Sequence, residues 1–279
     1  MPINFLQNIK SSVSSKQKQV LGQEEAYHEL NGNVFEAYIF SCKDLKRPQP
    51  LFNDGLPSLI LMPQKSDTVH LKGDSETTTC NAAWVCCGII ENIYWEVPKG
   101  LENILVLRFK PSYFYSLFNV LPSVFHSKPI HNLEDVVGER WMSVFDEMYE
   151  KDTLSERISF LKNVFSSFET NRYFPYVLTV AIDYIEDKKG NATVSEVLNQ
   201  LGKNVNPKWL HRNFVKYIGI APKKYISLQR FIYTYGLYDK NNLEDLFNVA
   251  LLSGYYDYNH FLKDFKRYIG IAPSLYTWD

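Results

Sequence analysis

FVKYIGIAPKKY (residues 214–225) and DFKRYIGIAPSLY (residues 264–276) contain the same six-residue phrase, Tyr-Ile-Gly-Ile-Ala-Pro. The two copies are offset by 51 residues, from Tyr217 to Tyr268. A glycine after an apolar run favours the left-handed conformation that ends a helix, and a proline favours the first turn of a new helix. Each copy therefore predicts one helix that stops and a second helix that begins.

The segment before the first copy predicts two helices. Thr193 and Glu196 have the spacing of a capping box, in which each side chain bonds the backbone amide of the other residue. Asn206 and Pro207 predict the start of a second helix, with asparagine as the N-cap and proline in the first turn. This second helix continues to about Tyr217, so the segment reads as a helix-turn-helix unit.

The same plan precedes the second copy. Asn242 is placed to cap a helix with Asp245 at its third position, and Gly254 ends that helix. Asp257 or Tyr258 then begins the next helix. The chain is therefore expected to carry two helix-turn-helix units.

Residues 222–240 read as one helix that joins the two units. At ~1.5 Å per residue this helix is roughly 28 Å long, and one turn of B-DNA is ~34 Å. A rigid helix of that length is suited to hold two recognition helices in successive major-groove segments. Arg230, which lies on this helix, is expected to make structural contacts rather than to bind phosphate.

The second helix of each unit has one apolar edge and one polar edge. At about 100° per residue, Leu210, Phe214 and Tyr217 fall close to one line, and we expect this edge to be buried. The opposite edges carry cations or amides and no acid, as a helix in a major groove does when it binds bases and phosphates. A basic edge that only faces solvent has the same pattern. The candidate DNA-binding residues from this geometry are Lys208, Arg212 and Lys216, with His211 at the flank, and Asn259, Lys263, Lys266 and Arg267.

GYYDYNHFLKDFKRYIGIAPSLY (residues 254–276) resembles the signature of the AraC/XylS family of bacterial transcription regulators. The resemblance covers roughly residues 174–279 and implies a DNA-binding domain of two helix-turn-helix units joined by a long helix. It also implies DNA contact at particular positions. These are Lys208, His211, Arg212, Asn259, His260 and Lys263.

The chain departs from the family pattern in several places, one of which is Leu198, where the family customarily has a small alanine. Ala221 and Ala272 stand where the family usually has serine before the proline of the repeated phrase. Loss of a serine N-cap typically costs about 1 kcal/mol. The turn of the first unit, GKNVN (residues 202–206), is expected to be about two residues longer than is usual in the family.

The front half has a different sequence pattern. Short runs of β-branched and aromatic residues, separated by Gly, Pro, Asn and Asp, predict an antiparallel sheet, sandwich or barrel. Apolar residues then recur three and four apart in residues 133–149 and 154–168, which predicts two amphipathic helices. The predicted strands fall in residues 34–41, 58–62, 68–72, 82–90, 92–97 and 104–109.

Two stretches of the front half resemble, more weakly, the cupin-like sensory half of one branch of the AraC/XylS family. They are NDGLPSLIL (residues 53–61) and VLRFKPSYF (residues 106–114). The expected fold class is therefore α+β, in three parts. They are a β-rich cupin-like sensory or dimerisation domain (1–131), a helical connector (132–172) and an all-α double helix-turn-helix DNA-binding domain (173–279).

The amino-acid composition is compatible with this three-part organisation but does not establish it. The chain has 279 residues, 45% hydrophobic and 22% charged, with a net charge of −1. Residues 190–279 contain 11 Lys and Arg against 7 Asp and Glu, so the last third is mildly basic, which is compatible with a polyanionic partner. We expect a cytoplasmic protein, because no signal-type or membrane-spanning apolar run is found and the four cysteines suit a reducing compartment.

The sequence carries no recognisable catalytic signature. The six histidines do not pair at metal-ligand spacing, so no metal and no cofactor are expected. Cys86 and Cys87 are adjacent in a strand-like run, where one is expected to point inward; a redox sensor is left open. The aromatic residues of the front half fit a core, and they also fit an apolar effector pocket.

We therefore interpret the chain as a sequence-specific transcription regulator with double-stranded DNA as its partner, and not as an enzyme. One alternative is a cupin-type small-molecule-binding protein or enzyme with a helical appendage. A second is a module that binds only other proteins. A small-molecule effector at the front domain, contact with RNA polymerase and a homodimer are left open.

Overall fold

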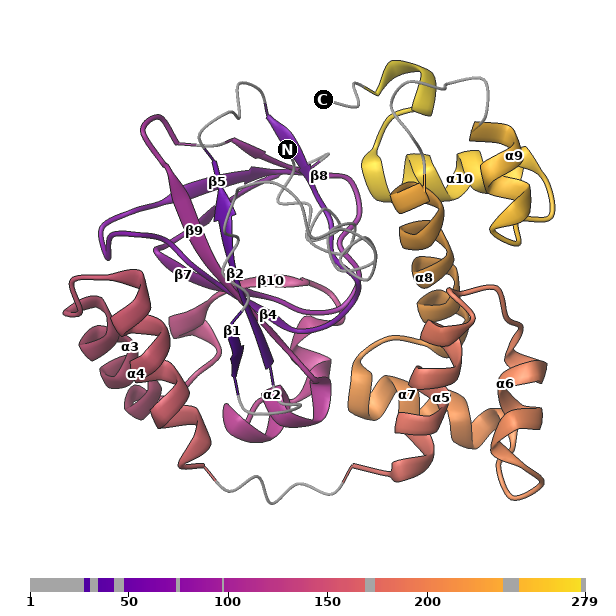
Figure 1. Ribbon diagram of the computed structural model, residues 1–279, viewed down its shortest axis with the longest axis horizontal. Helices are drawn as coiled ribbons and strands as arrows, with labels where there is room; N and C mark the ends of the chain where they lie inside the picture. Colours follow the sequence, from indigo (N-terminus) through magenta and orange to yellow (C-terminus); the bar gives the residue numbers. More distant parts are fainter. Residues whose placement is uncertain are drawn as a thin grey trace.

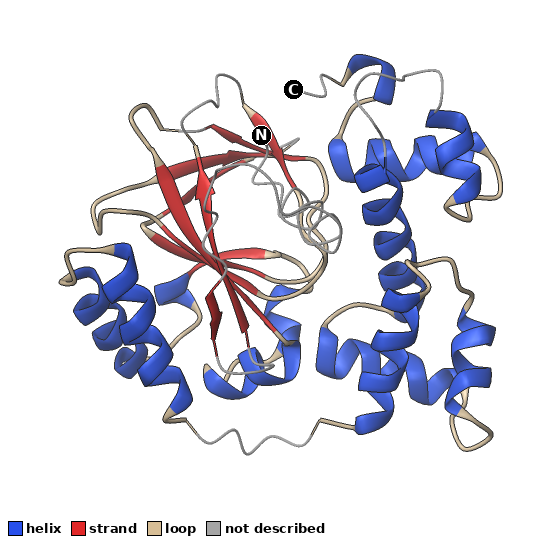
Figure 2. Ribbon diagram, viewed as in Figure 1, coloured by secondary structure: helices blue, strands red, loops and turns tan. Residues whose placement is uncertain are grey.

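The computed structural model describes residues 28–30, 35–42, 48–73, 76–96, 98–168, 174–237 and 246–276. Strands make up most of the front half and helices the rest, as Figures 1 and 2 show. The α+β fold class is confirmed. None of the helices in this part of the chain combines the length and the apolar character needed to cross a membrane.

Two antiparallel sheets form the front half. The larger has the order β1-β2-β9-β4-β7-β10, and the smaller has the order β3-β8-β5-β6. All six predicted runs contain a strand, whereas β1, β3, β6 and β10 were not predicted. The bounds are β1 His28–Leu30, β2 Phe35–Ser41, β3 Gln49–Leu51, β4 Ser58–Leu61, β5 Val69–Lys72, β6 Thr77–Cys80, β7 Ala83–Cys86, β8 Ile93–Glu96, β9 Asn103–Phe109 and β10 Ile130–Asn132.

The central strands of the larger sheet are buried on both faces. Ile60 and Trp84 pack into the core between the two sheets, whereas their neighbours Leu59 and Val85 pack into a second core on the opposite face. Because side chains alternate across a strand, a strand covered on both faces is apolar throughout. This explains why the run Leu59–Leu61 in β4 is apolar and buried without alternation.

Helices of the front half cover the outer face of the larger sheet. The apolar residues of α3 and α4, among them Trp141 and Phe165, share one core with the sheet. The helical prediction for residues 133–149 began too early, because Leu133–Asp135 form a 3-10 turn and Gly138 is extended. The remaining helical elements here are α2 and η1, which the sequence did not reveal. The bounds are α2 Pro111–Leu117, η1 Pro122–Phe125, η2 Leu133–Asp135, α3 Glu139–Tyr149 and α4 Leu154–Ser166.

Six helices and a final 3-10 turn follow in the described part of the back half. The helix α8 runs between two groups of helices, with α5, α6 and α7 around one end and α9 and α10 around the other (Figure 1). This is the predicted pair of helix-turn-helix units on one linking helix. The bounds are α5 Tyr176–Asp187, α6 Val194–Leu201, α7 Pro207–Ile218, α8 Pro222–Leu237, α9 Leu246–Leu252, α10 Tyr258–Ile269 and η4 Pro273–Leu275.

The local signals of the first unit are confirmed. Thr193 and Glu196 form a capping box, with both reciprocal hydrogen bonds present. The Asn206 side chain accepts from the backbone N–H of Trp209 at 2.9 Å. At the other end of α7, Gly219 has φ +85°, the left-handed conformation that the repeated phrase predicted.

The second unit repeats this geometry. Asp257 caps α10 by accepting from the N–H of His260 at 2.7 Å, and Gly270 ends the helix at φ +91°. The turn between α6 and α7 (202–206) and the turn between α9 and α10 (253–257) have the same length. The predicted cap at Asn242 and Asp245, and the last residues of the predicted linking helix (238–240), lie outside the described residues.

A close backbone approach joins α5 to α8. Gly190 lies against the backbone of α8, and a Cβ built on it would stand 2.1 Å from the N atom of Arg230. The Arg230 guanidinium donates to the carbonyls of Gly190 (3.0 Å) and Ala192 (3.3 Å). Arg230 is therefore engaged in the packing of the first unit, in keeping with the structural role expected for it.

Candidate nucleic-acid interface

The first candidate recognition helix is α7. Its apolar edge is buried, with Leu210, Phe214 and Ile218 fully covered in the core of the first unit. Tyr217 is half-buried and packs on the edge of the same core. The predicted DNA-binding residues of this helix are all exposed: Lys208, His211, Arg212 and Lys216.

The second candidate recognition helix is α10. Phe261, Phe265 and Tyr268 are fully buried in the core of the second unit. Lys266 is exposed, as the helical geometry predicted. The predicted residues Asn259, His260 and Lys263 are also exposed, whereas Arg267 is half-buried.

The acid within α10 does not reach its exposed edge. Asp264 is 7% exposed, and its Oδ2 accepts from Ser227 Oγ on α8 at 2.8 Å and from Tyr255 Oη at 3.2 Å. Burial, followed by the charge of Asp264, raises the pKa of the neighbouring Tyr268 to about 12. The inward acid thus fixes α10 on α8 and leaves the exposed edge basic.

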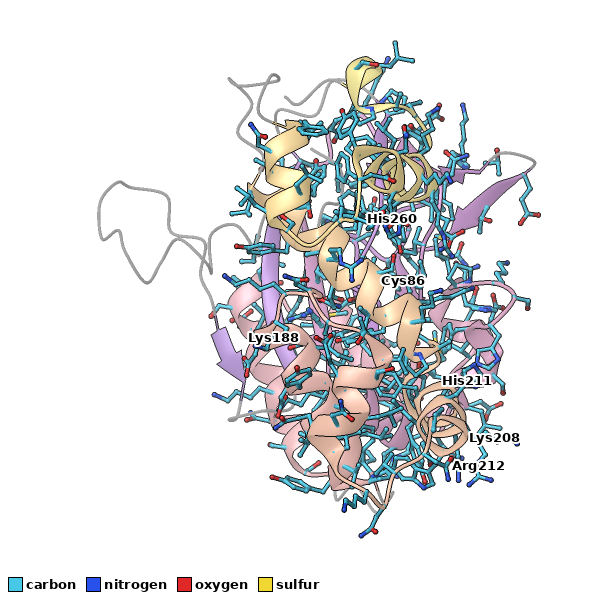
Figure 3. All side chains as sticks on the ribbon, turned by 90° about the vertical axis from the view of Figure 1, so that its right-hand side faces the viewer. Cys86, Lys188, Lys208, His211, Arg212 and His260 are labelled. Atoms are coloured by element: carbon cyan, nitrogen blue, oxygen red, sulfur yellow. The ribbon has the colours of Figure 1, made fainter. Side chains whose placement is uncertain are left out.

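Figure 3 shows where the labelled side chains lie. Lys208, His211 and Arg212 lie together at the edge of the first unit, and His260 lies on the second unit, towards the other end of α8. The helix α8 between the units spans residues 222–237, which at ~1.5 Å per residue is roughly 24 Å. Tyr225 on α8 donates to Glu186 on α5 at 2.7 Å, and Ser227 on α8 donates to Asp264 on α10, so α8 is bonded to a helix of each unit.

The front half packs against both units. Phe52 is fully buried among residues of α8, with edge-on ring contacts to Phe231 (6.1 Å) and Tyr235 (5.4 Å). Gln229 on α8 also donates to the backbone carbonyl of Asp54 at 3.0 Å. Sequence reasoning gave no sign of these contacts, because the partners lie more than a hundred residues apart in the chain.

Each copy of the repeated glycine lies at this interface. A Cβ on Gly219 would lie 3.4 Å from the Tyr115 hydroxyl and 3.6 Å from Pro122. A Cβ on Gly270 would overlap Asn92, at 1.8 Å from its Oδ1 atom. The helix-ending glycines therefore also provide the room in which the front half approaches the C-terminal ends of α7 and α10.

Within the described part of the chain, Arg267 is the predicted DNA-binding residue that forms an ion pair with the front half. Its Nε and Nη2 atoms lie 2.7 and 2.6 Å from Oε1 of Glu91, in the segment between β7 and β8. The Arg267 side chain is 34% exposed. Arg267 lies on α10, as the sequence predicted, but its guanidinium forms an ion pair with the carboxylate of Glu91.

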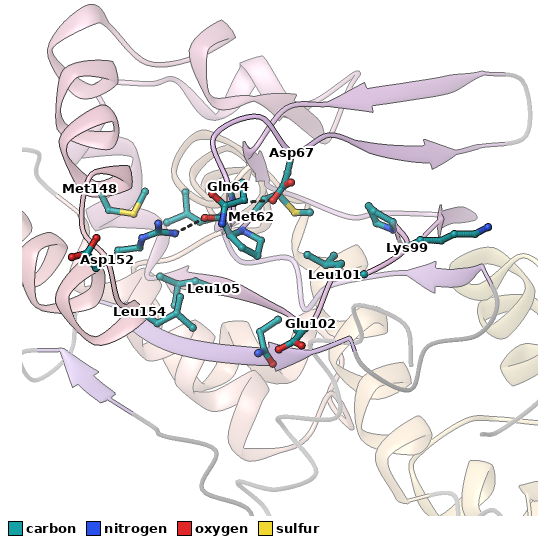
Figure 4. Close-up of a pocket in the computed structure, with 16 residues that line it drawn as sticks. Met62, Gln64, Asp67, Lys99, Leu101, Glu102, Leu105, Met148, Asp152 and Leu154 are labelled. Carbon is teal, nitrogen blue, oxygen red and sulfur yellow. Dashed lines mark hydrogen bonds between the residues drawn. The ribbon is translucent and has the colours of Figure 1, made fainter.

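A cavity of about 410 Å³ opens between the larger sheet with its adjoining loops and the helices α3 and α4 (Figure 4). Its apolar wall includes Leu101, Leu105 and Met148, and charged side chains such as Asp152 stand at its edge. Arg157 contributes to the lining, but it donates to the carbonyl of Pro63 at 2.6 Å and so serves the packing of α4. The size falls within the range of small-molecule sites.

The core between the two sheets contains polar atoms that lack protein partners. Within the described residues, the indole N–H groups of Trp84 and Trp95 are buried without an acceptor. Buried donors of this kind normally bond to protein, water or ligand. The aromatic residues of the front half are thus mainly core residues. Among the described residues, the indole N–H groups of Trp84 and Trp95 have no protein acceptor.

The cysteines are buried thiols. Cys86 packs between the sheets and Cys87 packs on the outer face, so adjacent residues alternate as expected, but both are buried. Burial raises the pKa of Cys42 and of Cys80 to about 12, which disfavours the reactive thiolate. No group of three His, Cys, Asp or Glu side chains in the described part of the chain is placed to hold a metal ion.

Comparison with known proteins finds similarity only among solved structures. No protein-family model matches the sequence, and no curated protein matches it. An apo variant of ToxT from Vibrio cholerae is 15% identical and has a TM-score of 0.46, over 89% of this chain and 98% of that one. Unsaturated fatty acid-bound wild-type ToxT from the same organism is 17% identical, with a TM-score of 0.47, over 89% of this chain and 96% of that one.

A further match is the AraC-like transcriptional activator CuxR. It is 11% identical and has a TM-score of 0.24, over 71% of this chain and 78% of that one.

Proposed function

We propose that this chain is a sequence-specific DNA-binding transcription regulator that performs no catalysis. The observation that supports this most strongly is the repeated geometry of α7 and α10. Each helix is the second of a helix-turn-helix unit, buries one apolar edge and exposes a basic or amide edge without an acid. In this fold the second helix enters the major groove, with its N-terminal residues near the base edges.

Each helix would divide its contacts between bases and phosphates. Lys208, Arg212 and Lys263 are placed to bind guanine or phosphate, and Asn259 is placed to bind adenine. Lys216 and Arg267 lie in the last turns of α7 and α10, and we assign them to phosphate contacts rather than base contacts. The histidines His211 and His260 are exposed on the same surfaces and complete the proposed site.

The output would be recruitment or exclusion of RNA polymerase in a bacterial cytoplasm. Because one chain carries two reading helices, it can contact two adjacent half-sites without a second subunit. A homodimer is therefore an addition to this proposal and not a requirement of it.

Binding to duplex DNA selected from a random pool tests the proposal. We expect Arg212→Ala and Lys263→Ala each to weaken specific binding by ~1–3 kcal/mol at fixed salt, with little loss of folding. Lys99→Ala is the matched control, because Lys99 is an exposed lysine of the front half. If both variants bind the selected duplex as tightly as the parent and the control, α7 and α10 do not read DNA.

We further propose that the front half binds a small effector in the core between its sheets. The support is that the indole N–H groups of Trp84 and Trp95 are buried in this core and have no acceptor among the described residues, as donors do when a bound molecule supplies the acceptor. Trp84→Phe and Trp95→Phe remove these donors and keep an aromatic ring at each position. Bound molecules extracted from the parent and absent from both variants would support the site, and equal recovery from all three proteins would refute it.

The second candidate function is a cupin-type small-molecule-binding protein or enzyme, and the same indole donors and the 410 Å³ cavity favour it. Such a protein would bind its ligand without any effect of DNA. Elemental analysis of the purified chain, together with a footprint on genomic DNA, separates the two functions. A bound metal and no footprint would favour the enzyme.

A further inference from the structure

Three residues of the front half hold the last turn of α10. The carboxylate of Glu91 holds the Arg267 guanidinium at 2.6 and 2.7 Å. The backbone N–H of Asn92 donates to the carbonyl of Tyr268 at 3.4 Å, and the Tyr94 hydroxyl donates to the carbonyl of Ile269 at 2.8 Å. Consecutive residues of the helix are thus matched by nearly consecutive residues of the front half.

These contacts satisfy groups that a helix end leaves open. The last carbonyls of an α-helix have no partner within the helix, and here Asn92 and Tyr94 supply donors to two of them. Gly270 makes the approach feasible, because its φ of +91° suits glycine and its missing Cβ leaves room for the Asn92 side chain. The docking is therefore specific to this end of this helix.

Arg267 belongs to the same surface stripe as two proposed DNA-binding residues. It follows His260 by seven residues and Lys263 by four, so the three side chains lie on one face of α10. His260 and Lys263 are exposed, whereas the guanidinium of Arg267 lies on Glu91. A phosphate that approached this stripe would meet a cation already neutralised by a carboxylate.

We propose that Glu91 competes with DNA for Arg267, so that the front half restrains DNA binding by the second unit. This inference rests on the proposed function, because it assigns a regulator to the same helix. The ion pair is partly exposed, with 34% of the Arg267 and 41% of the Glu91 side chain accessible. Pairs of this kind are weak enough to open, so the contact tunes binding and does not block it.

The test uses Glu91→Gln, which removes the charge and keeps the shape. The affinity of the full chain for its selected duplex is measured over a series of salt concentrations for the parent, Glu91→Gln, Arg267→Ala and the double variant. Glu96→Gln is the matched control, since Glu96 also forms an ion pair, with Lys72, and lies on β8 in the same sheet as Tyr94.

We expect Glu91→Gln to bind the duplex about two- to fivefold more tightly than the parent, from the usual strength of exposed ion pairs. Its salt dependence should steepen by about one released counterion, a slope change near −0.9. The gain should vanish when Arg267 is alanine, and Glu96→Gln should match the parent. Unchanged or weaker binding by Glu91→Gln would overturn competition, while a parent that binds no selected duplex would instead refute the proposed function, and this inference with it.

Discussion

Phe52→Ala tests whether the front half and the linking helix form one cooperative structure. Phe52 follows β3 in the front half, yet it is fully buried in the core of the second unit. Its ring meets Phe231 at 65° and Tyr235 at 77° between ring planes, both edge-on. Edge-on aromatic pairs are each worth about 0.5–1.5 kcal/mol beyond the area they bury.

The expected cost follows from this burial. Truncating a fully buried phenylalanine to alanine typically costs about 3–5 kcal/mol, which includes the cavity it leaves. Because the lost contacts join two parts of the chain, we expect Phe52→Ala to lower the free energy of unfolding by about 3–4 kcal/mol. It should also separate the unfolding of the helical part from that of the sheets.

Urea denaturation followed by far-ultraviolet circular dichroism and by hydrogen exchange measures both effects. Phe247→Ala is the control, because Phe247 lies on α9 of the same unit and is 48% exposed. It should cost at most about 1 kcal/mol. If Phe52→Ala is no more costly than Phe247→Ala and leaves a single transition, the two parts of the chain do not depend on each other through this contact.

Three further predictions concern the helices themselves. Gly190→Ala should destabilise the chain by at least about 3 kcal/mol, because φ is +69° there and the new Cβ would lie 2.1 Å from the α8 backbone. Gly236→Ala is the contrasting variant, because a Cβ at that position would have no neighbour within 4 Å. It should stabilise α8 by about 0.5–1 kcal/mol in the same denaturation assay. The backbone and side-chain hydrogen bonds of Thr193 lower the pKa of Glu196, so its contribution is present at neutral pH and is lost as pH falls through and below the usual carboxyl range. Glu196→Gln should therefore be less stable than the parent at neutral pH, and the difference should shrink as pH falls below the usual carboxyl range; a constant difference at all pH values would refute this. Ala221→Ser should add about 0.5–1 kcal/mol by restoring an N-cap before α8, as thermal unfolding would measure; no gain would mean that the cap position is already satisfied.

Local signals explain which parts of the fold the sequence could reveal. The Thr193–Glu196 capping box, the Asn206 cap and the glycines at 219 and 270 act on groups three to five residues away, so a single sequence displays them. The strand β6 was missed because its Thr-Thr-Thr-Cys sequence has only one buried side chain and little apolar pattern. The helix α2 was missed because it begins at Pro111 directly after the strand β9, with no N-cap side chain before it.

The candidate site likewise has one part that the sequence predicts and one part that it does not. The exposed edges of α7 and α10 follow from helical periodicity, and all eight proposed residues except Arg267 are exposed. The contact of Arg267 with Glu91 joins residues 176 positions apart. No local pattern encodes such a pairing, since only the packing of the front half on α8 brings the two side chains together.

The most direct measurement of the central claim is a hydroxyl-radical footprint on the selected duplex, made with the parent, Arg212→Ala and Lys263→Ala. Two reading helices held by α8 predict two protected segments on one face of the duplex, about one helical turn apart. Arg212→Ala should weaken one segment and Lys263→Ala the other. A single protected segment, or two segments that both variants weaken equally, would contradict the claim that α7 and α10 read DNA as two separate units on one rigid helix.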